Sequence, residues 1–214
     1  MLESLDRLDI GDRRPRLRFS ARISIWPPAQ LLQTASCFGV FMNRPYKSKI
    51  LLSTETAALL IVDCQSDLGA NLGNPLRDSP IRTIETVVEN ATALRVPIVS
   101  TVYSANGNGV VDPLPLAANL DNIVRACANP WEDDVVRARV SDTGRDRIVI
   151  LGNCEKGGIS FSVLGALETG YQPYVVVDAI HSASSLDAST ALTRMTQAGA
   201  ISLTGRQIML EWGR

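Results

Sequence analysis

The chain has 214 residues, of which 45% are hydrophobic and 20% charged, enough to build one large α/β domain around a substantial core. The formal net charge is −1, but residues 1–50 hold nine of the 21 Lys and Arg and four of the 22 Asp and Glu. Residues 51–214 therefore carry 12 basic and 18 acidic side chains, a net charge of −6. This acidic body argues against nucleic acid as the principal partner, because binding phosphates needs a basic surface.

The first 50 residues are the least regular part of the chain. Between residues 13 and 49 there is no Asp or Glu, and a leader that is rich in Arg and poor in acid is typical of an organelle transit peptide. Acidic residues in the first dozen positions count against that interpretation. We favour a poorly ordered basic extension, or an upstream extension of a chain whose natural start is Met42, followed by one domain over residues 51–214.

From residue 51 onward, strand and helix patterns alternate. Short runs rich in Val, Ile and Leu that stop in turn-forming residues predict buried parallel strands at 57–63, 97–103, 147–152, 173–178 and 201–204. Helices are predicted at 81–94, after Trp131, and at 158–169, 185–198 and 207–212, the first of them capped by Ser79-Pro80. This alternation predicts a three-layer α/β/α sandwich with a mainly parallel, doubly wound sheet.

Two strand ends carry the candidate chemistry. Asp63 ends the first strand in AALLIVDCQ, and the turn from Asn153 to Gly158 follows the third strand in RIVILGNCEKGG. Because ligands bind at the carboxyl ends of neighbouring central strands, we expect both to face one cavity. A partly desolvated carboxylate suits proton transfer, although Asp63 could instead only cap its turn. Gln65 is either a group that orients a substrate or a solvated turn residue.

The cysteine pattern and the absence of long apolar runs bear on location. The four cysteines form no CxxC pair and no disulfide-like cluster, which suits a reducing cytosol; they are Cys37, Cys64, Cys127 and Cys154. No apolar run approaches a membrane span, and the start lacks the order of a secretory signal. A cytoplasmic protein without a membrane partner is expected.

Five segments of the sequence, taken in chain order, resemble a known protein family. They are LLIVDCQSDL, VPIVSTVY, NPWEDDVVRARVSDTGRDRIVILG, GALETGYQPYVVVDAIHSAS and ALTRMTQAGAISLT. The set spans nearly everything from residue 56 to residue 212 and resembles the isochorismatase-like hydrolase superfamily, most closely its oligomeric, cysteine-hydrolase-like subgroup. The resemblance implies the isochorismatase-like hydrolase fold, a homo-oligomer, and hydrolysis of a small polar substrate at a C–O or C–N bond.

The resemblance also assigns catalytic positions. The family commonly uses an Asp that activates a thiol, a Lys that stabilises developing negative charge, and a Cys that attacks the substrate. Asp63 falls on the acid position, Arg125 on the Lys position after a one-residue gap, and Gly158 on the Cys position. Arg can stabilise an oxyanion but releases a proton less readily than Lys, and a surface or dimer-contact role for Arg125 stays open. Covalent thiol catalysis at residue 158 is excluded.

Two catalytic interpretations survive the loss of this thiol. Family members that cleave the vinyl ether of isochorismate also carry Gly here, and their Asp acts as a general acid while water adds. Alternatively, Cys154 is a displaced nucleophile or a substrate ligand, although a small buried hydrophobe is the simpler interpretation. Lys156 is either a replacement for the family Lys or a solvated loop residue. We also expect Gln65, Asn153 and Trp131 to bind the substrate.

No metal or other cofactor is expected. The nicotinamidase branch of the family binds zinc through an Asp and paired histidines, whereas this chain contains only His181, which we expect in a loop beside the pocket. The segment DCQSDLGANLG lacks a GxGxxG after the first strand, which argues against a dinucleotide site. The alternative function is that of a catalytically lapsed family member that serves as a binding or assembly protein, because function resides in sites rather than folds.

Overall fold

The computed structural model describes residues 48, 50–65, 75–104, 113–115, 117–153, 157–182 and 184–214, with the backbone alone at 75–78. Six strands form one all-parallel sheet in the order β3-β2-β1-β4-β5-β6. Their bounds are β1 (Ala57–Val62), β2 (Ile98–Tyr103), β3 (Asn122–Arg125), β4 (Arg147–Asn153), β5 (Gln172–His181) and β6 (Ile201–Leu203). The predicted α/β class with a parallel sheet is confirmed.

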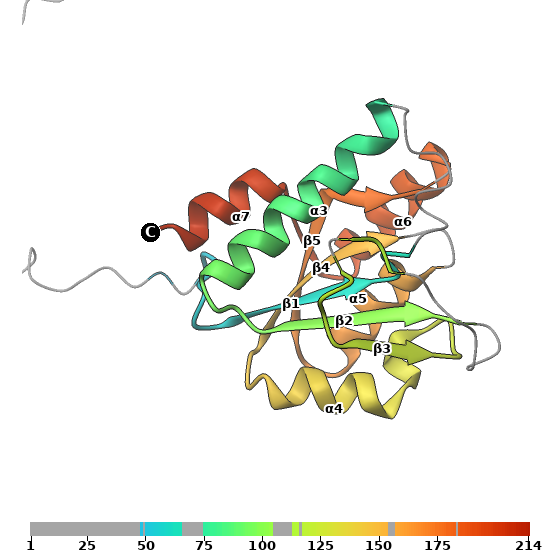
Figure 1. The fold of residues 1–214 in the computed structure, drawn as a ribbon, viewed down its shortest axis with the longest axis horizontal. Coiled ribbons are helices and arrows are strands. Elements are labelled where there is room, and N and C mark those ends of the chain that lie inside the picture. Colours follow the sequence, from blue (N-terminus) through green and yellow to red (C-terminus); the bar gives the residue numbers. More distant parts are fainter. Residues whose placement is uncertain are drawn as a thin grey trace, which may run out of the picture. The chain divides into compact units, whose positions relative to one another are not determined.

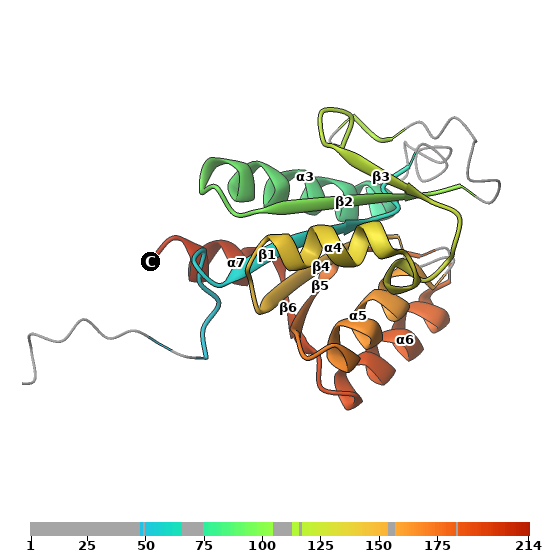
Figure 2. The ribbon, with the colours of Figure 1, turned by 90° about the horizontal axis from the view of Figure 1, so that it is seen from below.

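Helices cover both faces of the sheet. Their bounds are α3 (Pro75–Ala93), α4 (Asp134–Asp142), α5 (Gly158–Glu168), α6 (Ser185–Gln197) and α7 (Gly205–Trp212), with a short 3-10 helix, η2 (Pro130–Glu132). Figures 1 and 2 show α3 and α7 on one face and α4, α5 and α6 on the other, which makes three layers. Within the described residues, no helix is both long and apolar enough to cross a membrane.

Two apolar clusters, one on each face of the sheet, form the core. All six residues of β1 are buried, and they alternate between the clusters, so that Leu59 and Ile61 face α3 and α7 while Leu60 and Val62 face the other helix layer. Each fully buried Leu, Ile or Val contributes about 1.5–3 kcal/mol relative to exposure. The continuous apolar sequence of β1 is thus explained by its position between two helix layers.

The predicted start of the first helix is wrong. The expected cap was Ser79-Pro80, but α3 begins at Pro75 and contains Pro80 in its interior. Pro75 itself occupies the first helical position, where a missing N–H costs nothing because the first turn has no intrahelical acceptor. Pro80 removes one hydrogen bond near the start of a 19-residue helix, which the rest of the helix tolerates.

Two strands also differ from expectation. β3 was not predicted, because it is only four residues long and its burial alternates, so that its apolar signal is weak. β5 extends to His181 rather than stopping at Asp178, because a register shift between Ile150 and Gly152 lets its second half pair with β4 again. The added strand places Arg125 at the carboxyl edge of the sheet.

The sheet order creates a topological switch point between β1 and β4. From these two central strands, β2 and β3 continue to one side and β5 and β6 to the other. The carboxyl ends of β1 and β4 lie side by side in the view of Figure 1, in agreement with their register, which pairs Val62 with Gly152. In open α/β sheets this is where ligands bind.

Side chains hold the segment before β1 at the opposite, amino end of the sheet. Arg147 Nη1 donates to the Leu51 carbonyl at 2.6 Å, and Glu211 Oε2 accepts from the Leu52 N–H at 2.5 Å. Tyr174 Oη donates to the Ile50 carbonyl at 3.3 Å. Residues 1–47 lie outside the described part of the chain, so the basic extension and the domain boundary near residue 50 stay predictions.

Candidate active site

Asp63 follows β1 directly and is fixed by its backbone. Its φ of 55° lies in the left-handed region, which Asp adopts more readily than most residues. The Asp63 N–H donates to the Thr101 carbonyl at 2.9 Å, and its own carbonyl accepts from the Gln65 N–H at 3.0 Å. The residue is 5% exposed. A buried carboxylate with this backbone is held at the carboxyl end of β1.

Arg125, the last residue of β3, pairs with this carboxylate. Its Nη2 donates to Asp63 Oδ1 at 2.6 Å and to Oδ2 at 2.5 Å, and the arginine is only 1% exposed. The alternative of a surface arginine is therefore wrong. Because the two charges are buried together, removal of one partner would leave the other uncompensated, at a cost of about 3–5 kcal/mol.

The remaining contacts fix the guanidinium of Arg125 in place. Its Nη1 donates to the carbonyls of Cys127 and Ala128, the latter at 3.0 Å. Its Cζ lies 5.6 Å from the ring centroid of Tyr103, within the range of a cation–π contact. Its Nε is buried and has no hydrogen-bond partner among the described residues.

The side-chain amide of Gln65 helps to hold the ends of β1 and β2 together. Its Nε2 donates to the Tyr103 carbonyl and its Oε1 accepts from the Tyr103 N–H, both at 2.9 Å. The amide thus acts as an extra strand residue that ties the end of β1 to the end of β2. A substrate-binding role for Gln65 stays a prediction; in this structure both ends of its amide are engaged with Tyr103.

Gly158 opens α5 beside the ion pair. A Cβ at this position would lie 2.8 Å from Asp63 Oδ2, 2.9 Å from Val62 Cγ1 and 3.6 Å from Arg125 Nη2. Gly157, with a φ of 78°, is the N-cap, and no described side chain caps the helix. The three residues assigned to catalysis by resemblance, Asp63, Arg125 and Gly158, therefore meet at one point, beside a helix start whose N–H groups favour negative charge.

The other expected site residues fall in different places. Asn153 and His181 are buried and face each other in register at the ends of β4 and β5, next to the switch point. Trp131 is 7% exposed, packs edge-on against Tyr171, and donates from Nε1 to Thr169 Oγ1 at 2.8 Å. These contacts account for Trp131 as a residue that holds η2 against α5, and its substrate-binding role stays a prediction.

Neither of the two described cysteines, Cys64 and Cys127, is an activated thiol. Burial, together with the negative charge of Asp63, raises the pKa of Cys64 to about 12. Burial is also the main cause that raises the pKa of Cys127, with Asp133 adding to it. Cys154 and Lys156 lie outside the described residues, so a displaced nucleophile or cation in that turn stays a prediction. The described residues contain no group of three or more His, Cys, Asp or Glu placed to hold a metal ion.

Sequence reasoning missed Tyr103 and Thr101. Both lie at the carboxyl end of β2, the strand next to β1, and Tyr103 lies opposite Arg125 in the register of β2 and β3. The rule that ligand sites form at the carboxyl ends of strands could have nominated them. Together the described groups offer a carboxylate, a buried guanidinium and an uncapped helix start, a set suited to proton transfer and to stabilising developing negative charge.

Comparison with known proteins identifies a family and a shared fold. Residues 57–207 match the model of a protein family described as the isochorismatase domain. The probable hydrolase YcaC of Escherichia coli K12 is 27% identical over 172 residues, which cover 76% of this chain and 79% of that protein.

Two solved structures share the fold at 25% sequence identity. One is Escherichia coli YcaC, described as an octameric hydrolase of unknown specificity, with a TM-score of 0.68 over 79% of this chain and 85% of that chain. The other is YcaC from Pseudomonas aeruginosa with hexane-2,5-diol and covalent acrylamide, with a TM-score of 0.68 over 79% of this chain and 86% of that chain.

Proposed function

The chain belongs to the isochorismatase domain family, and from this premise we propose that it is a hydrolase that cleaves a C–O or C–N bond of a small polar substrate without a thiol intermediate. The observation that carries the proposal is the meeting of Asp63, Arg125 and Gly158 at the switch point of the sheet. This placement combines a proton-transfer group, a fixed cation and a close backbone approach.

Each of the three residues has a role in this proposal. Pairing with a guanidinium stabilises the carboxylate form of Asp63, which would accept a proton from the attacking water in amide hydrolysis. In cleavage of a vinyl ether, Asp63 would first take up a proton from solvent, against the stabilising effect of Arg125, and would then donate this proton to the substrate while water adds. The guanidinium of Arg125 would stabilise negative charge on the substrate. Gly158 would let the substrate approach the first N–H groups of α5.

Glycine at residue 158 also argues against a covalent intermediate at this position. Gly158 has no side chain that could attack a substrate, so hydrolysis at this position would proceed by direct attack of water. Resistance of the activity to thiol alkylation would support this route, and loss of activity on alkylation would point to Cys154 instead.

The test is hydrolysis by the purified chain, wild type beside Asp63→Asn, on isochorismate and on a panel of small amides. We expect the variant to lose about a hundredfold or more of the rate, because general acid–base groups contribute that much. Asp121→Asn is the matched control, since it removes the carboxylate of an exposed Asp–Arg pair and should leave the rate unchanged. Arg125→Lys, which keeps the charge, should retain part of the activity. Full activity of a folded Asp63→Asn variant would refute the role of Asp63.

One observation favours a second candidate, a lapsed family member that binds or assembles without turnover. Both oxygens of Asp63 accept from Arg125, and the exposed fractions of the two side chains are 7% and 0%. A carboxylate so enclosed presents little surface to a substrate. A folded protein without turnover on either substrate class would favour this candidate.

Assembly and location follow from the same premise. Because the Escherichia coli relative is described as octameric, we propose that this chain also forms a homo-oligomer. Light scattering of the purified chain tests this point, and a monomer would contradict it. A cytoplasmic location, suggested by four cysteines that form no CxxC pair and no disulfide-like cluster in the sequence, belongs to the same proposal.

A further inference from the structure

A polar hollow lies between α3 and α7, and none of the residues that line it belongs to the candidate active site. It has a volume of about 250 Å3 and is lined by residues of α3, α7 and β5. The two helices approach closely at its base, since a Cβ on Gly205 would lie 2.6 Å from Thr83 Cγ2. The start of α7 is fixed there by Asp178, whose Oδ1 accepts from the Gly205 N–H at 2.8 Å.

Two arginines from different helices line this hollow. Arg82 comes from α3 and Arg206 from the first turn of α7, and both are exposed. Within the described part of the chain, neither guanidinium makes a hydrogen bond or an ion pair. The positive end of α7 adds to their field, whereas Asp178, the one carboxylate among the described residues that line the hollow, already accepts a hydrogen bond from that helix start.

The other polar groups suit a ligand that carries hydroxyls. The hydroxyls of Thr83 and Thr86 donate to the carbonyls of Ser79 and Arg82, at 3.2 and 2.9 Å, so their oxygens remain able to accept. The volume is below the roughly 300–1,000 Å3 typical of sites for drug-sized molecules, which points to a small ligand.

We propose that this hollow binds a small, hydroxylated phosphate monoester. Arg82 and Arg206 hold the phosphate, because guanidinium groups match phosphate oxygens in geometry and charge. Asp178 and the threonine oxygens accept from the hydroxyls of the ligand. The hollow shares no residue with the candidate active site, so the proposal does not depend on hydrolase activity.

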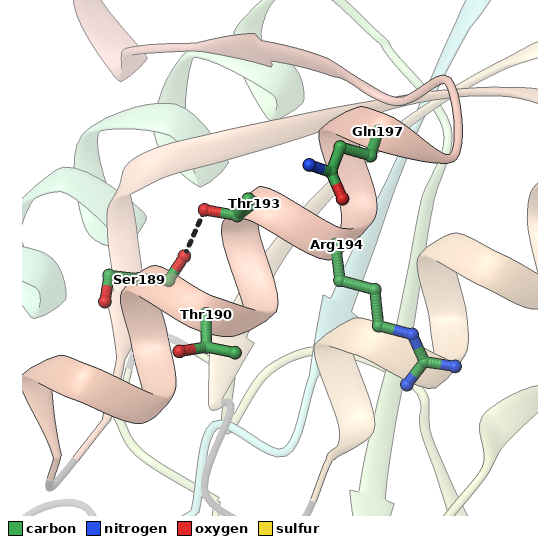
Figure 3. Close-up of a pocket in the computed structure, with 5 residues that line it drawn as sticks. All are labelled: Ser189, Thr190, Thr193, Arg194 and Gln197. Atoms are coloured by element: carbon green, nitrogen blue, oxygen red, sulfur yellow. Dashed lines mark hydrogen bonds between the residues drawn. The ribbon is translucent and has the colours of Figure 1, made fainter.

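A hollow on α6 provides a matched control within the same chain. It has a volume of about 290 Å3 and is lined by Ser189, Thr190, Thr193, Arg194 and Gln197. Figure 3 shows these five side chains along the one helix, with Thr193 Oγ1 bonded to the Ser189 carbonyl at 2.8 Å. Its hydroxyls resemble those of the α3–α7 hollow, but it contains one arginine instead of two.

The test is calorimetric titration of the full chain with glycerol phosphate, inorganic phosphate and glycerol. We expect saturable binding of glycerol phosphate at one site per chain, weaker binding of inorganic phosphate, and none of glycerol. Arg82→Gln and Arg206→Gln should each weaken binding about tenfold or more, because each removes a charged hydrogen bond. Arg194→Gln should leave it unchanged. Both substituted arginines are exposed, so the unfolding midpoint should stay constant.

Three results would overturn the proposal. The first is an absence of saturable glycerol phosphate binding at millimolar concentrations. The second is an equal loss of affinity in Arg194→Gln, which would indicate general attraction of anions to the surface. The third is unchanged affinity in both Arg82→Gln and Arg206→Gln. None of these results bears on Asp63 or on hydrolysis, so the two proposals fail separately.

Discussion

The ion pair of Asp63 and Arg125 depends on a neighbour that has no side chain. The first atom of any side chain at residue 158 would lie within 3 Å of both Asp63 Oδ2 and Val62 Cγ1. The space that a larger residue would occupy is therefore filled by the carboxylate itself. The absence of a side chain at residue 158 and the present position of Asp63 are two aspects of one packing arrangement.

Gly158→Ala tests this close approach. Alanine normally stabilises a helix position relative to glycine, by up to about 1 kcal/mol. Here we expect a destabilisation of about 1–3 kcal/mol, because the added methyl group overpacks the contact with Asp63 and Val62. Urea unfolding measures the difference, with Ser160→Ala in the same helical turn as the control. An unfolding midpoint above that of the wild type would show that the ion pair does not need glycine beside it.

Residues of the site differ in how far the sequence could identify them. The strand-end rule nominated Asp63, and the resemblance nominated Arg125 and Gly158, all of which the structure brings together. Neither approach could find the engagement of the Gln65 amide with Tyr103, because a side chain that imitates a strand leaves no periodic signal. The burial of Arg125 was also hidden, since it belongs to a strand of four residues.

At the scale of elements, helix starts are set by individual caps. Asp133 precedes α4, and its Oδ1 accepts from the N–H groups of Val135 and Val136 at 2.9 and 3.2 Å. The adjacent Asp134 instead faces solvent, with a side chain that is 89% exposed and that pairs with Arg137. Of these two neighbouring carboxylates, the first therefore caps the helix and the second forms an exposed ion pair.

Asp133→Ala should destabilise the protein by about 1 kcal/mol, the usual cost of losing an N-cap. Asp134→Ala should change the stability by no more than about 0.5 kcal/mol, since an exposed ion pair contributes little. Chemical denaturation of both variants in parallel makes the comparison. Equal effects would mean that α4 does not rely on its cap.

Most elements agree with the sequence pattern, and the exceptions have local causes. Strands such as β1 and β4 were recognised because they are buried on both faces and read as unbroken apolar runs. The start of α3 was misplaced, because two prolines, Pro75 and Pro80, each fit a first helical position and the pattern favoured the second. The two possible helix starts are distinguished in the folded structure, where α3 begins at Pro75.

At the scale of the whole molecule, Leu52 is the first residue of the core among the described residues. Leu52 is fully buried in the cluster that α3 and α7 cover, and it is held by Glu211 and by Arg214 Nη2, which donates to its carbonyl at 3.4 Å. Within the part of the chain that the structure describes, every residue of both core clusters lies at or beyond Leu52. The folded body should not require the residues before this segment.

A chain that starts at Ser48 should therefore unfold at the same urea concentration as the full chain. A chain that starts at Ser53 loses the Leu52 side chain and its hydrogen bonds, and we expect it to be less stable by about 2–5 kcal/mol, as for removal of a buried leucine. Circular dichroism during the titration reports both. A large loss of stability on removal of residues 1–47 would give the basic extension a structural role.

The fastening of Leu51 and Leu52 at the amino end of the sheet has a practical consequence. Strands in a parallel sheet all run the same way, so a chain entering beside Arg147 and Tyr174 does so at the end farthest from Asp63. A biotin attached at the start of a chain that begins at Ser48 would tether the molecule to a sensor surface by that end. The carboxyl edge of the sheet, where Asp63 and Gly158 lie, would then be turned toward the flowing solution, so that ligands could be screened without interference from the support.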